Sequence, residues 1–179
     1  MKTKTLCIIP VYNEELRLKS LIAKINIERK KIKNINFLFI NNGSNDGSLT
    51  ILKKTKFQII NLKKNMGVGY ALILGLKFAL KNNYEILIHL AGNGKMLPSE
   101  IPIFLKQIIN NQIDFVSGSR FLKNGNYKTN PFMRIILIRI LSFFISIIYK
   151  KKITDATCGF RAFKTKLFKV LVDDSVLWG

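Results

Sequence analysis

The residues of this chain best suited to chemistry form a short polar turn near its middle, residues 89–95. The turn follows a short apolar run, residues 86–88, which is typical of a buried central strand. Its two glycines, Gly92 and Gly94, let the backbone turn sharply and approach a ligand closely. Ligands of open α/β sheets bind outside the carboxyl ends of the strands. The turn is therefore a candidate site, although a plain strand-to-helix loop would look the same.

Three other polar segments also follow predicted strands. Residues 41–48 are rich in Asn, Gly and Ser, and could either bind a nucleotide or simply turn into a helix. Residues 65–71 contain a Gly-x-Gly pattern, which is not a dinucleotide fingerprint because the third glycine is missing and the pattern follows the third strand. We expect the backbone N–H groups of residues 65–71 to lie near a bound anion. Residues 117–120 end in Arg120, which could clamp an anion.

Alternating strands and helices position these segments. Apolar runs predict strands at 6–11, 35–40, 57–62, 86–88 and 114–116, and the segments between them have helical periodicity. Asn13 is expected to cap the first helix, and an amphipathic helix is expected at 164–172. This alternation predicts an α/β fold, with a mostly parallel sheet sandwiched by helices.

The composition fits one domain, residues 1–179, with a strongly basic charge. There are 30 Lys and Arg against 10 Asp and Glu, a formal charge of +20. Such a balance indicates an anionic partner such as nucleic acid, a membrane surface or a phosphate-bearing substrate, although compositional drift toward Lys is an alternative. No nucleic-acid-binding module is recognisable. Cys7 and Cys158 form no disulfide framework and no secretion signal is seen, which favours a cytoplasmic location.

Residues 132–149 form the most apolar segment. On a helix, Arg139, Ser142, Ser146 and Lys150 would form one stripe on an otherwise apolar surface. This pattern predicts an amphipathic helix at 132–150 that lies in the interface of an anionic membrane. A core helix that covers the sheet is the main alternative. A transmembrane span fits less well, because the run is short and has an arginine in its middle.

Five ordered motifs resemble family-2 glycosyltransferases of the GT-A fold, in particular the dolichol-phosphate mannosyltransferase-like branch. They are IIPVYNEE at 8–15, NGSNDGS at 42–48, NxGxGxA at 65–71, SGSRF at 117–121 and DxxCGFRAF at 155–163. The resemblance implies an inverting transfer of a sugar from a GDP- or UDP-sugar to a polyprenyl phosphate or another membrane-associated glycan acceptor. It also implies a peripheral location at the inner face of the cytoplasmic membrane. In that branch the chain continues further, so we expect this one to be truncated at its carboxyl end.

The resemblance also assigns binding residues by position. The expected nucleotide-binding residues are Pro10, Tyr12, Glu14, Asn41, Asn42, Ser44, Gly67 and Asn93. Asn41 and Asn42 stand where the family usually has two aspartates, so their hydrogen-bond donors and acceptors differ. Arg120 and Arg161 are expected to face phosphates.

The central turn departs from the family's metal motif, Asp-x-Asp-x-Gln, because it has Ala91, Asn93 and Lys95 at those positions. The family implies Mg²⁺ or Mn²⁺, but such ions prefer carboxylate oxygens. Asn93 is a weak candidate ligand, and an ammonium group repels a cation. We therefore expect no conventional metal site, and Lys95, Arg120 and Arg161 to stabilise the leaving diphosphate instead. The alternative is a catalytically inactive GT-A-fold binding or scaffold protein.

Overall fold

The computed structural model describes residues 3–122, 125 and 131–169. Contacts divide the chain into two compact units. The sheet unit contains residues 1–116 and 160–179, and the helical unit contains residues 117–159.

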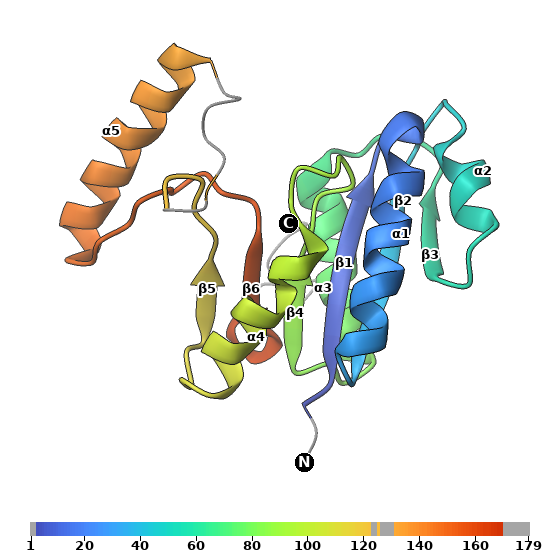
Figure 1. Cartoon of the computed structure of the whole chain (residues 1–179), viewed down its shortest axis with the longest axis horizontal. Helices are drawn as coiled ribbons and strands as arrows, with labels where there is room; N and C mark the ends of the chain where they lie inside the picture. Colours follow the sequence, from blue (N-terminus) through green and yellow to red (C-terminus); the bar gives the residue numbers. More distant parts are fainter. Residues whose placement is uncertain (1–2, 123–124, 126–130, 170–179) are drawn as a thin grey trace, which may run out of the picture. The chain divides into compact units, whose positions relative to one another are not determined.

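A six-stranded sheet organises the sheet unit, in the order β3-β2-β1-β4-β6-β5 (Figure 1). The strands are β1 (Thr5–Val11), β2 (Ile35–Asn42), β3 (Gln58–Leu62), β4 (Ile86–His89), β5 (Phe115–Ser117) and β6 (Arg161–Lys164). The pairs β1–β2, β1–β4 and β2–β3 are parallel, and β6 runs antiparallel to β4. The carboxyl ends of the four parallel strands therefore meet at one edge of the sheet, as predicted.

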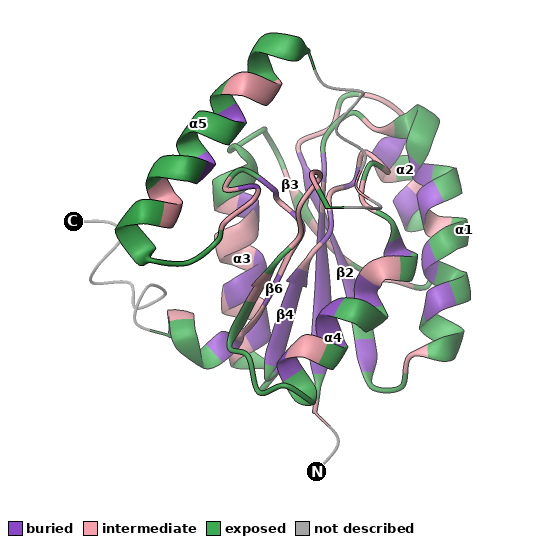
Figure 2. Cartoon of the chain, turned by 60° about the vertical axis from the view of Figure 1, so that its left-hand side comes forward, coloured by how far each residue is buried: buried purple, intermediate pink, exposed green. Residues whose placement is uncertain are grey.

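Helices flank this sheet. They are α1 (Glu15–Lys31), α2 (Ser48–Lys53), α3 (Val68–Lys81) and α4 (Ile101–Ile109), with short 3₁₀ helices at Pro98–Glu100 (η1) and Thr165–Phe168 (η2). Leu6 and Ile8 of β1 pack in one cluster with Leu76 of α3. Side chains alternate along a strand, so the equally buried Cys7 and Ile9 face the opposite side of the sheet. Both faces of the central strands are buried (Figure 2), which explains their nearly continuous apolar sequence.

The carboxyl-terminal part differs from the prediction. We expected no strand after residue 116 and a helix at 164–172, but residues 161–164 form β6 and, of the described part of that segment, only Thr165–Phe168 is helical. Residues 170–172 of the expected helix lie outside the described residues. Phe160 and Ala162 are buried at this strand, which pairs with β4. That partner is more than seventy residues away in sequence, so local periodicity could not reveal it.

The helical unit contains α5 (Phe132–Tyr149). By length and composition alone, α5 is apolar enough to cross a membrane. Ile138 and Ser142 are its buried residues, and most of its large apolar side chains are exposed. Within its own unit, α5 therefore leaves most of its apolar surface uncovered.

Candidate functional site

Hydrogen bonds join the loops that follow β1 and β2. Asn13 has a left-handed backbone conformation, with φ of 53°. Its N–H donates to Ser44 Oγ at 3.1 Å, and its Oδ1 accepts the N–H of Asn45 at 2.9 Å. The next N–H, that of Glu14, donates to Ser48 Oγ at 2.9 Å. The two loops therefore form one connected rim at the carboxyl edge of the sheet.

Asn13 consequently does not cap α1, contrary to the prediction. The helix begins at Glu15 without a side-chain cap from the preceding residue. Instead, the N–H of Glu15 donates to Asp46 Oδ2 at 3.0 Å, and Glu15 Oε2 accepts the N–H of Gly47 at 2.8 Å. Desolvation raises the pKa of Asp46, but hydrogen bonds from Ser48 and from backbone N–H groups outweigh it and leave that pKa below its ordinary value. A carboxylate near the amino end of α1 also suits the helix dipole.

Asn41 and Asn42 are both buried at the end of β2. Asn41 lies in register with Asn61 of β3, and its Nδ2 donates to Asn61 Oδ1 at 2.7 Å. The Asn41 Oδ1 atom is buried and has no hydrogen-bond partner among the described residues. A buried acceptor without a donor is destabilising, so a hydrogen bond from a donor on a ligand would be favourable at this atom.

Asn42 holds the loop between β3 and α3. Its Nδ2 donates to Asn65 Oδ1 at 2.9 Å, and its Oδ1 accepts the N–H of Met66 at 3.0 Å. Asn65 Oδ1 also accepts the N–H of Gly67 at 2.8 Å, just before α3 begins. An aspartate at position 42 could accept the Met66 N–H but could not donate to Asn65, so the amide here supports a loop contact that a carboxylate would change.

The central turn lies directly beside the end of β1. The N–H of Leu90 donates to Ile8 O at 3.0 Å, and the N–H of Gly92 donates to Pro10 O at 3.1 Å. A Cβ atom at position 92 would lie 2.6 Å from Pro10 O. Glycine is therefore needed at position 92 for the turn to remain this close to β1. The two glycines of the turn had indicated such a close approach of the backbone.

The three residues at the metal-motif positions do not fit a divalent cation. Asn93 Oδ1 accepts the N–H of Lys95 at 3.1 Å, so one lone pair of this neutral oxygen is already used. Ala91 offers no side-chain ligand, and the exposed Lys95 carries a positive charge. No group of three or more His, Cys, Asp or Glu side chains that could hold a metal ion occurs in the part of the chain that the structure describes. The turn can instead present a cation and backbone amides to an anion.

Arg161 belongs to the sheet unit and lies close to this turn. It is on β6, in register with His89 at the end of β4, and it is half-buried. The antiparallel strand that sequence reasoning missed is therefore the element that positions this predicted phosphate-facing residue.

Arg120 belongs to the helical unit, where it forms an ion pair with Asp155. Its Nε donates to Asp155 Oδ2 at 2.7 Å, its Nη2 to Oδ1 at 2.9 Å and its backbone N–H to Oδ2 at 3.1 Å. The Asp155 side chain is fully buried, whereas that of Arg120 is 22% exposed. Burial raises the pKa of Asp155, but the hydrogen bonds from Arg120 outweigh it and lower that pKa overall. The same hydrogen bonds raise the pKa of Arg120.

The sheet unit thus brings most of the predicted site residues to one edge. These are Pro10, Tyr12 and Glu14 after or within β1, Asn41, Asn42 and Ser44 at β2, Gly67 before α3, and Asn93, Lys95 and Arg161 at the β4–β6 end. Sequence reasoning missed Asn61, the partner of Asn41, although its position near the carboxyl end of β3 was an available signal. Asn65 was recognised in the 65–71 motif, but its hydrogen bond with Asn42 was not predicted.

Residues 6–172 match the family described as glycosyl transferase family 2. The UDP-N-acetylglucosamine–dolichyl-phosphate N-acetylglucosaminyltransferase of Methanococcus voltae is 29% identical, over 92% of this chain and 70% of its own. The polyprenol monophosphomannose synthase of Mycolicibacterium smegmatis is 23% identical, over 93% of this chain and 63% of its own. The chain thus spans about two thirds of these relatives.

Solved structures agree with the fold. The glucosyl-3-phosphoglycerate synthase of Mycobacterium tuberculosis, in complex with Mn²⁺, UDP-glucose and phosphoglyceric acid, matches with a TM-score of 0.69. That match has 16% identity and covers 93% of this chain and 58% of the other. This structural match confirms the predicted GT-A fold. The family match over residues 6–172 shows that this chain belongs to glycosyl transferase family 2.

Proposed function

We propose that this chain transfers a sugar from a GDP- or UDP-sugar to a polyprenyl phosphate or another membrane-associated glycan acceptor. The observation that carries the proposal is the joined rim of loops at one edge of the parallel sheet, where the predicted nucleotide-binding residues of the sheet unit gather. The names of the two relatives, which both act on polyprenyl-type phosphates, support the acceptor class.

The nucleoside is proposed to bind across the ends of β1 and β2. Tyr12 is 42% exposed there and offers an aromatic surface. Pro10 and Glu14 lie on either side of it in the sequence, and Ser44 is held on the adjoining loop. The unpartnered Oδ1 of Asn41 could accept an N–H of the base. Asn42 and Gly67 shape the neighbouring loop, and Asn93 lies on the central turn.

The reaction moves the anomeric carbon from one phosphate oxygen to another. An anionic oxygen of the acceptor phosphate forms the new bond to that carbon, while the bond from the carbon to the nucleoside diphosphate breaks. The electron pair of that bond leaves with the diphosphate. Because the attacking phosphate oxygen is already anionic, no base has to remove a proton from it. Negative charge develops on the leaving group, where Lys95 and Arg161 of the sheet unit are proposed to stabilise it electrostatically. Arg120, the third residue predicted for this role, belongs to the helical unit, where Asp155 orients it.

The sugar transfer is proposed to take place at an anionic membrane surface, on the cytoplasmic side. The formal charge of +20 and the exposed apolar side chains of α5 support a peripheral attachment in which α5 lies in the interface. A lipid-linked acceptor would be presented at that surface. Nucleic acid is not proposed as a partner.

Replacement of Lys95 tests the proposed substitute for a metal. We expect Lys95→Ala to reduce transfer by at least about a hundredfold, as the loss of one preorganised stabilising group does elsewhere. EDTA should have little effect on the unaltered chain. Lys54→Ala is the matched control, because Lys54 is an exposed lysine at the end of α2. Strong inhibition by EDTA, or full activity of Lys95→Ala, would contradict the proposal.

Two measurements separate transfer from a binding or scaffold role: turnover with sugar donors, and calorimetric titration with UDP and GDP, each with and without Mn²⁺. Metal-independent binding of one nucleotide would support a working donor site and identify the base. The absence of the acidic metal ligands favours the inactive alternative, which predicts no turnover with any sugar donor. Binding of neither nucleotide by the folded chain would favour that alternative.

A further inference from the structure

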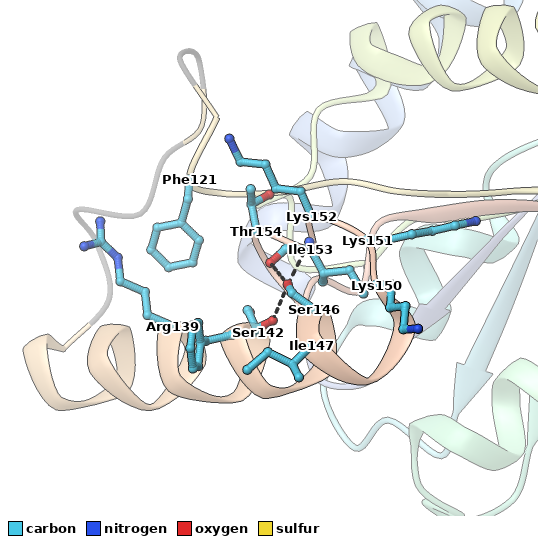
Figure 3. A pocket seen from close by; sticks show the side chains of 11 residues that line it. Phe121, Arg139, Ser142, Ser146, Ile147, Lys150, Lys151, Lys152, Ile153 and Thr154 are labelled. Atoms are coloured by element: carbon cyan, nitrogen blue, oxygen red, sulfur yellow. Dashed lines mark hydrogen bonds between the residues drawn. The ribbon is translucent and has the colours of Figure 1, made fainter.

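A groove runs along one side of α5, wholly within the helical unit. Its volume is about 620 Å³. Figure 3 shows the side chains that line it: Phe121, Arg139, Ser142, Phe143, Ser146, Ile147, the three lysines Lys150–Lys152, Ile153 and Thr154. None of these residues was assigned to the nucleotide site. The groove therefore requires a separate explanation.

Hydrogen bonds fix the two walls of the groove. Ser146 Oγ accepts the N–H of Ile153 at 2.9 Å, and Ser142 Oγ accepts the N–H of Ala156 at 3.0 Å. The Ser142 hydroxyl also donates to the Ile138 carbonyl at 2.7 Å. These contacts hold residues 153–156 against the helix. Because the serine hydroxyls are used internally, the floor of the groove presents mainly apolar surface.

Cations surround this apolar floor. Arg139 lies over the ring of Phe121, with its guanidinium carbon 5.4 Å from the ring centroid. Figure 3 shows Lys152 on the same side as Phe121, whereas Lys151 extends away from the serines. Within the described residues, neither Arg139 nor Lys152 forms an ion pair. Asp155 is the only acidic residue in the sequence from 117 to 159, and its carboxylate is already paired with an arginine.

The adjoining surface of α5 is apolar over about half of its circumference, at 3.6 residues per turn. The exposed residues of this apolar arc are Phe132, Met133, Leu137, Ile140, Leu141, Phe143, Phe144, Ile147 and Ile148. Arg134 lies at one edge of the arc and Arg139 at the other. An apolar arc with a cation at each edge suits a helix that lies at the level of lipid headgroups. Only the Arg139 edge borders the groove.

We propose that this groove is a binding site for one anionic phospholipid of the bilayer. Its phosphate would contact Arg139 and Lys152 at the rim, where arginine can donate two hydrogen bonds to a phosphate. Its acyl chains would follow the apolar floor beside Ile147 and continue along the apolar arc. The proposal does not depend on sugar transfer, since it concerns the helical unit alone. It predicts a saturable site in addition to general attraction to a charged membrane.

Binding of a monomeric short-chain lipid tests the site without a membrane. Dihexanoyl-phosphatidylglycerol, below its critical micelle concentration, is titrated into the full chain and followed by calorimetry. We expect saturable binding of one lipid per chain, weakened at least about tenfold in Arg139→Gln, because a charge-assisted hydrogen bond is lost. Arg134→Gln is the matched control, since it removes the same charge from the other edge of the arc and should bind like the unaltered chain. Ile147→Trp should also abolish binding, by filling the groove without changing the charge.

Three further ligands identify what the groove recognises. Dihexanoyl-phosphatidylcholine and inorganic phosphate should bind at least about tenfold more weakly, because one lacks the net charge and the other the apolar chains. Geranyl phosphate represents a polyprenyl acceptor. Its displacement of the lipid would overturn the proposal in favour of an acceptor site. Equal losses in Arg134→Gln and Arg139→Gln, or no saturable binding by the unaltered chain, would also overturn it. Circular dichroism of each variant verifies that the fold is retained.

Discussion

The ion pair between Arg120 and Asp155 makes a quantitative prediction for Asp155→Asn. The Asp155 carboxylate is fully buried and accepts three hydrogen bonds from Arg120. It accepts two more from Thr157, from the N–H at 3.2 Å and from the hydroxyl at 3.1 Å. An asparagine would remove the charge and place an NH₂ group against some of these donors. Removing one partner of a buried pair usually costs about 3–5 kcal/mol. Because the Arg120 side chain is 22% exposed to water, we expect the lower end, a loss of about 3 kcal/mol in the free energy of unfolding.

The effect of pH has a definite sign. The pKa of Asp155 in the folded chain lies below the ordinary value of 3.8. A carboxyl group with a lowered pKa stabilises the folded state fully above its ordinary pKa. That stabilisation is lost as the pH falls through the lowered value. The difference in stability between the unaltered chain and Asp155→Asn should therefore be constant near neutral pH and shrink below about pH 4.

Urea unfolding followed by far-UV circular dichroism measures both effects. Asp114→Asn is the control, because Asp114 also pairs with a cation, Lys164, at 2.6 Å, but is about half exposed. Water screens that pair, so we expect little change. The reasoning fails if Asp155→Asn unfolds within about 0.5 kcal/mol of the unaltered chain at pH 7, or if its deficit persists unchanged at acid pH.

Two further predictions concern the central turn and α5. Gly92→Ala should destabilise the chain by about 1–3 kcal/mol and weaken nucleotide binding in a calorimetric titration, because its Cβ would lie 2.6 Å from Pro10 O. Gly69→Ala is the control, because Gly69 lies in α3 and an added Cβ would have no atom within 4 Å. It should be neutral or stabilise the chain by up to about 1 kcal/mol. Equal losses of stability in both variants would contradict the packing argument. Phe144→Ser should leave stability nearly unchanged, since Phe144 is 57% exposed, but lower partitioning into phosphatidylglycerol vesicles about tenfold, because a buried Phe contributes roughly 1.5–3 kcal/mol. Unchanged vesicle sedimentation of Phe144→Ser would argue against α5 as the membrane contact.

Much of the fold could be predicted because its signals are local. The apolar runs around Cys7, Phe39 and Leu87 predict strands, and β1, β2 and β4 occupy these positions. The helical periodicity of residues 132–149 likewise coincides with α5. Since parallel strands end at one edge of a sheet, the sequence also indicated where the polar loops would meet.

What each polar side chain does there was decided by the tertiary structure. The hydrogen bonds of Asn42 with Asn65, of Asn41 with Asn61 and of Arg120 with Asp155 all join residues twenty or more positions apart. β6 was missed for the same reason, because its partner β4 is distant in the sequence. Side-chain periodicity reports which face of an element is buried, whereas hydrogen-bond partners depend on which elements the folded chain brings together. The sequence by itself therefore determined the parallel strands and the edge at which their polar loops meet. Only the fold determined β6 and which polar groups at that edge remain available to a ligand.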